Sequence, residues 1–179
     1  ALRFAAPQPY PQWAGVRDAL AKGPIAPQPT PSPAQMEKVL PGIDLAPLVG
    51  DGIVTGDDFL VANIWTSGQT GAAHPVMVFI HGGSFTGGSG NADVYDGTSF
   101  ARAGVVCVTI NYRLGIEGFL PIPGAPTNLG LRDMLASLQW VKDNITVELE
   151  RMASESDVDA QLAAMKAELG SAPARPQIE

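Results

Sequence analysis

Residues Pro75–Gly90, PVMVFIHGGSFTGGSG, join an apolar run to a loop rich in glycine. The run Pro75–Ile80 is short and uninterrupted, which is typical of a strand buried inside a parallel sheet. The loop that follows holds a histidine, two serines and several glycines, so its backbone can turn tightly and approach a ligand closely. These residues fit an anion cradle, half of a catalytic site, or a tight surface turn.

Apolar runs and helical patterns alternate around this loop. An alternating stretch at 57–67 and an uninterrupted β-branched run at 105–113 predict two more strands. A short helix is predicted over Gly97–Gly104, ending on the glycine, and a longer one follows the loop residues that open 124–145. Strands alternating with helices are typical of a doubly wound α/β sheet, which is the fold class we predict.

The longer helix has an apolar face, which we expect to lie against the sheet. The residues that recur at helical spacing are Leu131, Leu135, Leu138 and Val141. Two further side chains, Met134 and Trp140, widen this face.

The first 50 residues are rich in proline, which fixes φ and removes a backbone donor. We therefore predict extended or looping chain there, with one helical turn at Met36–Leu40. Four apolar side chains give this segment something to bury, so we expect it to wrap around the core: Phe4, Trp13, Val16 and Leu20.

Composition excludes several classes of function. With 179 residues, 45% hydrophobic and 16% charged, the chain is long enough for a globular core. A net charge of −7 without a basic cluster argues against nucleic acid as a partner. The single cysteine, Cys107, can form no intrachain disulfide and no cysteine-based metal site, and its apolar neighbours predict a buried thiol.

No segment signals a membrane span, a cofactor or a metal. No apolar run approaches the ~20 residues that cross a bilayer, and the first residues show no signal-peptide layout. The absent signal and the scarcity of cysteine favour the cytoplasm. The sequence reads as the middle of a chain rather than its natural start, which weakens that inference.

Several motifs in a fixed order resemble one family. They are LRFAAPQP with Trp13 and GVRDA, then DDFLVANIWTS, VMVFIHGGSFTGGSG, VVCVTINYRLGIEGFL and NLGLRDMLASLQWVKDNI. Together, over residues 1–145, they resemble the type-B carboxylesterase/lipase family of α/β hydrolases, which includes para-nitrobenzyl esterases and cholinesterases. The resemblance implies an ester hydrolase acting on small-molecule esters, with the N-terminal part of a doubly wound α/β-hydrolase sheet in 1–145.

In that family the loop donates backbone N–H groups to the oxyanion of a tetrahedral intermediate. The resemblance places these donors at Gly83 and Ser84, with Gly82 holding the turn. Ser84 departs from an all-glycine loop, but a backbone donor tolerates a small side chain, and this serine is not the nucleophile. By the same correspondence His81 is structural rather than the catalytic base.

The resemblance also assigns scaffold positions. Five polar residues match the family's strand end and helix opening and are expected to make structural hydrogen bonds: Asn111, Tyr112, Arg113, Asn128 and Asp133. His74 is expected in an exposed loop. Phe59 stands where many relatives have a disulfide-forming cysteine, so that bridge is missing here.

The serine nucleophile of the family lies on a G-x-S-x-G elbow, and no serine of this sequence fits that pattern. The acid and the base, which lie far downstream in relatives, are also absent. We therefore expect the isolated chain to be inactive, as a hydrolase truncated before the elbow. Natural fusion, truncation and an engineered cut stay open as origins, as does a partner chain that supplies the triad.

Residues 146–179 change in character to an acidic amphipathic helix and a proline-containing tail. SESDVDAQLAAMKAELG, within 146–170, resembles the C-terminal helix of the phage-shock-protein A family, and also a downstream helix of bacterial type-B esterases. The alternative function is therefore a non-catalytic scaffold that assembles through this helix. Self-association through the helix or through an exposed sheet edge is expected on either view.

Overall fold

The computed structural model describes residues 3–11, 14–15, 18–29, 38, 41–43, 54–68 and 74–146. Several predictions concern residues outside these ranges: Trp13 and Val16, the turn at Met36–Leu40 apart from Lys38, and the C-terminal helix and tail after residue 146. The domain boundary at residue 145 likewise stays a prediction.

Three strands form one mixed sheet in the order β1-β3-β2. They are β1 (Ala62–Trp65), β2 (Val76–Ile80) and β3 (Val106–Ile110). The central strand β3 pairs parallel to β2 and antiparallel to β1. All three strands lie within the runs that predicted them, and every residue of β3 is buried.

The burial predicted for β2 is wrong. Its residues are half-buried and Ile80 is exposed, because β2 lies at an edge of the three-stranded sheet rather than inside it. The uninterrupted apolar run correctly indicates parallel pairing, with Val78 opposite Val108, but not how much of the strand other elements cover.

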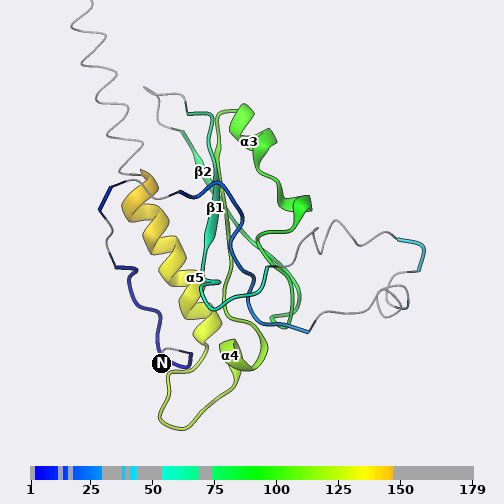
Figure 1. Ribbon diagram of the computed structural model, residues 1–179, viewed down its shortest axis with the longest axis vertical. Coiled ribbons are helices and arrows are strands. Elements are labelled where there is room, and N and C mark those ends of the chain that lie inside the picture. The colour runs from blue at the N-terminus through cyan, green and yellow to red at the C-terminus, as the bar shows by residue number, and fades with distance from the viewer. Residues whose placement is uncertain are drawn as a thin grey trace, which may run out of the picture.

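Helices lie on opposite faces of the sheet, as the doubly wound prediction requires (Figure 1). On one face Val106, Val108 and Ile110 pack with Met134 of α5 (Leu129–Trp140) and with Val141, the first residue of the π-helical turn η2 (Val141–Thr146).

The other face carries Cys107 and lies beneath Gly97, where a Cβ atom would be 2.8 Å from the Cys107 Cβ. Gly97 caps α3 (Thr98–Arg102), which occupies the predicted range 97–104, and Gly104 follows with a left-handed φ of 80°. A 3-10 turn, η1 (Asp93–Tyr95), precedes this helix.

The face predicted for α5 is rotated from the one that packs. Leu129, Gly130 and Asp133 are its buried residues, and Val141 beyond it is buried as expected. Met134, which was predicted to widen the face, is half-buried and packs against the core. The other four predicted members are instead exposed, by 42%, 66% and 40% for Leu131, Leu135 and Leu138 and by 41% for Trp140. Helical spacing identified an apolar stripe but not the neighbour that covers it.

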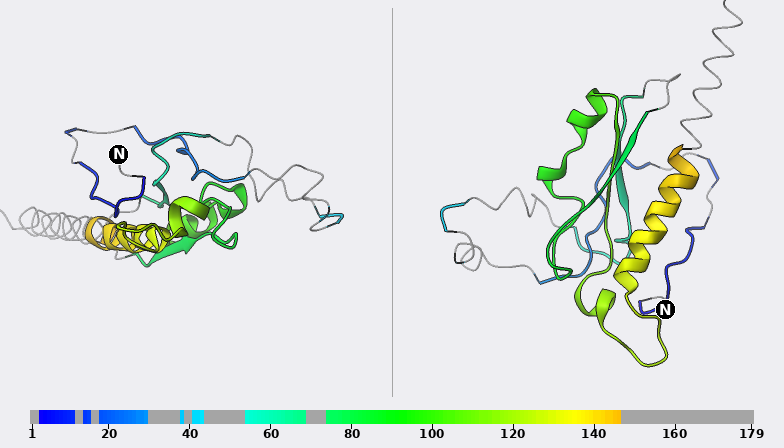
Figure 2. Two further views of the ribbon diagram at one scale, coloured as in Figure 1. Left: turned by 90° about the horizontal axis from the view of Figure 1, so that it is seen from below. Right: turned by 180° about the vertical axis from the view of Figure 1, so that it is seen from behind.

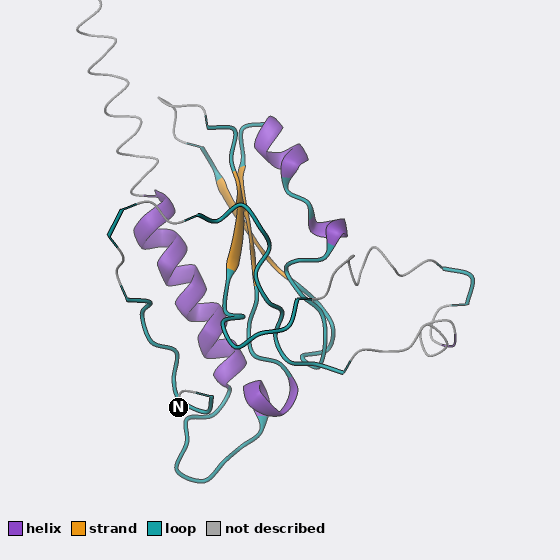
Figure 3. Ribbon diagram, in the orientation of Figure 1, coloured by secondary structure: helices purple, strands orange, loops and turns teal. Residues whose placement is uncertain are grey.

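The proline-rich segment packs where it passes the sheet (Figure 2). Ala26 is 2% exposed and packs with Tyr112 and Leu114, and the Ile25 N–H donates to the Val54 carbonyl at 2.9 Å. Leu20, by contrast, is 96% exposed, so its predicted burial is wrong. In the described parts this segment is almost entirely loop, as its prolines predict (Figure 3).

Candidate active site: the glycine-rich loop after β2

The loop at residues 82–88 makes one tight left-handed turn. The φ angles of Gly83, Ser84 and Phe85 are 118°, 54° and 63°. The Gly83 carbonyl accepts hydrogen bonds from the N–H groups of Thr86 at 3.0 Å and Gly87 at 3.1 Å. A Cβ atom on Gly83 would lie 2.0 Å from the Gly87 carbonyl oxygen, so only glycine fits there.

The first backbone N–H groups of this turn are not used in hydrogen bonds within it. Within the described residues, neither the Gly83 N–H nor the Ser84 N–H has an acceptor, and Gly82, Gly83 and Ser84 are all exposed. Leading N–H groups of a helical turn have no partner inside it and are available to an anion. The loop therefore offers adjacent backbone donors at the carboxyl end of a strand, where ligands of α/β sheets bind.

His81 fixes the orientation of one of these donors. Its Nδ1 lies 2.8 Å from the Gly82 carbonyl oxygen and donates to it. That carbonyl and the Gly83 N–H belong to the same planar trans peptide, in which C=O and N–H point in opposite directions. Holding the carbonyl therefore sets the direction of the Gly83 N–H.

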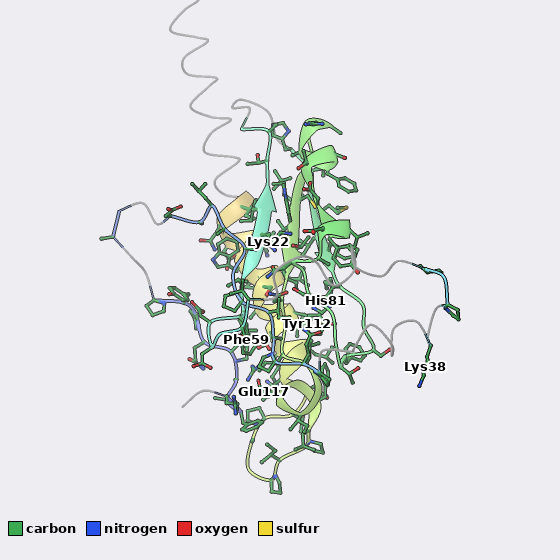
Figure 4. The ribbon with its side chains drawn as sticks, turned by 45° about the vertical axis from the view of Figure 1, so that its right-hand side comes forward. Lys22, Lys38, Phe59, His81, Tyr112 and Glu117 are labelled. Carbon is green, nitrogen blue, oxygen red and sulfur yellow. The ribbon has the colours of Figure 1, made fainter. Side chains whose placement is uncertain are left out.

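The His81 ring is itself held in the interior. It is 3% exposed and stacks on Tyr112 with ring centres 4.5 Å apart, and the Tyr112 hydroxyl donates to the His81 carbonyl at 2.9 Å (Figure 4). Burial lowers the pKa of His81 below its ordinary 6.5, and the bond to Gly82 opposes this shift. Because Nε2 is buried without a partner among the described residues, the ring is neutral with its proton on Nδ1. This position suits a structural histidine, as expected.

Asn111 holds the far end of the loop. Its Oδ1 accepts from the Ser89 hydroxyl at 3.2 Å and the Gly90 N–H at 2.8 Å, while its Nδ2 donates to the Pro24 carbonyl at 3.1 Å. Asn111 is 3% exposed, so its bonds to Ser89 and Gly90 are buried, while the bond to Pro24 is partly buried. The predicted scaffold roles of Asn111 and Tyr112 are confirmed.

Arg113 and Asp133 form a buried ion pair. The guanidinium donates to the Asp133 carboxylate from Nε at 2.7 Å and Nη2 at 2.6 Å, and the Arg113 backbone N–H adds a third bond at 3.1 Å. Nη1 reaches the carbonyls of Arg3 and Ala5 at 3.0 and 2.8 Å. The pair ties the end of β3, helix α5 and the first described residues together, as expected for scaffold positions.

Two predicted positions differ from expectation. Asn128 makes no capping bond with its side chain at the start of α5; it contributes a left-handed backbone with φ 53°, which asparagine tolerates well. His74 is half-buried rather than exposed, and its Nδ1 lies 2.8 Å from the Gly104 carbonyl oxygen.

The burial predicted for Cys107 is confirmed. Cys107 is a buried free thiol whose pKa burial raises, with a smaller contribution from Asp96. Phe59 packs against the cluster of Ala26, Tyr112 and Leu114, so this position makes an apolar contact. No group of three metal-ligating side chains occurs among the described residues, and no helix there is long and apolar enough to cross a membrane.

Sequence reasoning missed Gln28. This residue lies in the proline-rich segment and bonds to the loop across 60 positions of sequence. The neighbouring prolines indicate only extended chain, so no local signal could identify its partner.

The fold agrees with comparisons to known proteins. A family model described as "Carboxylesterase family" matches residues 1–147. Phenmedipham hydrolase of Pseudarthrobacter oxydans is 43% identical over 80% of this chain and 27% of its own length. Para-nitrobenzyl esterase of Bacillus subtilis (strain 168) is 39% identical over 80% of this chain and 28% of its own length.

Acetylcholinesterase of Gallus gallus is 40% identical over 80% of this chain and 18% of its own length. A solved PNB esterase structure superposes with a TM-score of 0.67 and 38% identity, over 80% of this chain and 28% of that one. The chain thus spans less than a third of the length of these relatives. It belongs to the carboxylesterase family, and its described residues form the N-terminal part of an α/β-hydrolase fold.

Proposed function

We propose that this chain supplies the oxyanion-binding segment of a carboxylic ester hydrolase that acts on small-molecule esters. The observation that carries the proposal is the pair of N–H groups at Gly83 and Ser84, exposed and without an acceptor among the described residues. Gly82 holds the turn through its bond to His81. Names of the matched relatives include esterases and hydrolases, which supports this class of reaction.

The chemistry explains what the two donors would do. In ester hydrolysis a serine oxygen attacks the carbonyl carbon, the carbonyl oxygen takes up the electron pair, and the serine proton passes to a base. The Gly83 and Ser84 N–H groups would hold that oxyanion until the intermediate collapses and the alcohol leaves. Donors fixed before the charge develops stabilise the transition state more than the ground state.

No serine of the 179-residue sequence fits the nucleophile elbow, so the chain alone should not form an acyl-enzyme. We expect no burst of p-nitrophenolate from p-nitrophenyl acetate and no covalent labelling by a fluorophosphonate. Stoichiometric labelling of any serine, located by peptide mass spectrometry, would overturn this part of the proposal.

A chimera tests the oxyanion role directly. The segment of Bacillus subtilis para-nitrobenzyl esterase that matches this chain is replaced by residues 1–147 of this chain. We expect the chimera to hydrolyse p-nitrophenyl acetate and the Gly83→Ala version to lose about 10²–10³ in kcat, the loss expected for one oxyanion donor. The alanine Cβ would overlap the Gly87 carbonyl and displace the turn.

Gly124→Ala is the matched control. Gly124 also has a left-handed φ, of 79°, but no atom lies within 4 Å of its added Cβ, and it lies in another loop. Its kcat should equal that of the parent chimera. Equal activity of the Gly83→Ala and Gly124→Ala chimeras would contradict an oxyanion role for the loop.

A further inference from the structure

The Gln28 side chain pairs with both polar backbone groups of one loop residue. Its Oε1 accepts from the Gly88 N–H at 2.7 Å, and its Nε2 donates to the Gly88 carbonyl at 2.8 Å. Since a backbone N–H needs an acceptor and a carbonyl needs a donor, the orientation of the amide is unambiguous. The side chain thus pairs with Gly88 as a neighbouring strand would.

Gln28 is well placed to hold the loop still. Its Nε2 also donates to the Ala26 carbonyl at 3.1 Å, so both amide hydrogens are used. Ala26 is 2% exposed in the cluster with Tyr112, which anchors the backbone beside Gln28. An anchored side chain loses little further freedom when it bonds to the loop.

Gly88 in turn lies against the start of the loop. Its φ is 100°, and a Cβ atom there would be 2.4 Å from the Gly82 carbonyl oxygen and 2.6 Å from His81 Nδ1. These are the two atoms whose hydrogen bond orients the Gly82–Gly83 peptide. A shift of Gly88 would therefore disturb that peptide directly.

We propose that Gln28 is a positioning residue for the glycine-rich loop, acting through Gly88 and Gly82 on the donor at Gly83. The assignment of that donor to an oxyanion rests on the proposed function above. A side chain of the proline-rich segment thus sets the geometry of the candidate active site from 60 positions away in sequence.

The test compares full-length Gln28→Leu with Gln8→Leu. Leucine nearly keeps the shape of glutamine and removes both bonds to Gly88. Gln8 is a matched control because it lies in the same proline-rich segment and makes only a weak exposed bond to Ala6, at 3.4 Å. Amide exchange of Gly88 and the NMR shifts of the Gly83 and Ser84 amides are read in each variant.

We expect the Gly88 N–H to exchange about tenfold faster in Gln28→Leu, as the loss of two modest hydrogen bonds predicts. In Gln28→Leu the Gly83 and Ser84 amide signals should move, while the amide signals of β3 should stay. In the control Gln8→Leu, all amide signals of loop 82–88 should stay. The proposal is overturned if the Gly88 N–H of Gln28→Leu exchanges at the wild-type rate. It is also overturned if that N–H exchanges faster while the Gly83 and Ser84 signals do not move. Should Gln28→Leu not fold, Gln28→Glu keeps an acceptor for the Gly88 N–H but sets a carboxylate oxygen against the Gly88 carbonyl. Movement of the Gly83 and Ser84 amide signals in that variant supports the proposal, and unmoved signals overturn it.

Methylphosphonate, a tetrahedral oxyanion, separates this proposal from the proposed function. In the wild-type chain it should shift the Gly83 and Ser84 amides, and the shifts should shrink in Gln28→Leu. Absence of any wild-type response would count against oxyanion binding, whereas the exchange and shift readouts would still decide the role of Gln28.

Discussion

Asp133→Asn tests whether the buried ion pair holds this part of the fold together. Arg113 and Asp133 side chains are 4% and 2% exposed. The carboxylate accepts three hydrogen bonds from Arg113, one of them from the backbone N–H. Asparagine offers a single acceptor oxygen and turns an N–H group toward the guanidinium, so the substitution leaves a buried positive charge without its counter-ion.

The magnitude follows from that uncompensated charge. Removing one partner of a buried pair costs about 3–5 kcal/mol, because the remaining ion stays desolvated. A domain of this size has a free energy of unfolding of about 5–15 kcal/mol, so the loss is a large share of the total. At an m-value of about 2 kcal/mol per molar, the urea midpoint should fall by about 1.5–2.5 M.

Urea unfolding followed by tryptophan fluorescence measures the effect, with Glu117→Gln as control. Glu117 pairs with Arg3 at 3.0 Å, but the Arg3 side chain is 63% exposed, so this pair is worth about 0–1 kcal/mol. Replacing the buried pair by Arg113→Met with Asp133→Leu should cost less than Asp133→Asn alone, since no buried charge remains. A shift for Asp133→Asn no larger than that for Glu117→Gln would refute the reasoning.

Three other predictions use the loop and the core. Ser84→Gly should raise the urea midpoint slightly, because about 1 kcal/mol of left-handed strain is relieved and only partly offset by a freer unfolded chain; a lower midpoint contradicts this. The pKa of His81 is lowered by burial, so the unfolded state binds its proton more readily, and the free energy of unfolding should fall as pH drops below 6.5. His81→Gln should remove that part of the pH dependence, and an unchanged slope refutes it. The buried thiol of Cys107 should react with a disulfide reagent only as fast as the chain opens, so immediate stoichiometric reaction of the native chain would count against its burial.

Local sequence patterns predicted the strands and the short helix because each depends on neighbours in sequence. Alternation at 57–67 contains β1, and the β-branched run at 105–113 contains the buried strand β3. The glycine that ends the range 97–104 adopts the left-handed φ that follows a helix end. In these places propensity, pattern and turn chemistry agree with the final fold.

Contacts between distant segments were not predictable in the same way. Helical spacing placed Leu131, Leu135 and Leu138 on one face, yet all three are exposed, because burial depends on which neighbour covers a face. Asn128 was expected to bond through its side chain, but its backbone conformation is what the helix start uses. For Gln28 the partner lies 60 residues away, beyond the reach of any local pattern.

The proline-rich segment explains why so much of the candidate site depends on distant partners. Proline has no N–H, so an extended stretch of this kind keeps carbonyls free for donors from elsewhere. Side chains that follow the loop and strand β3 use them: Asn91 donates to the Gly23 carbonyl at 2.8 Å and Asn111 to the Pro24 carbonyl at 3.1 Å. In the opposite direction, the Gln28 side chain of the proline-rich segment donates to the Gly88 carbonyl of the loop. The loop is therefore held from outside itself, and changes in residues 23–28 should move the Gly83 and Ser84 amides before they affect the sheet.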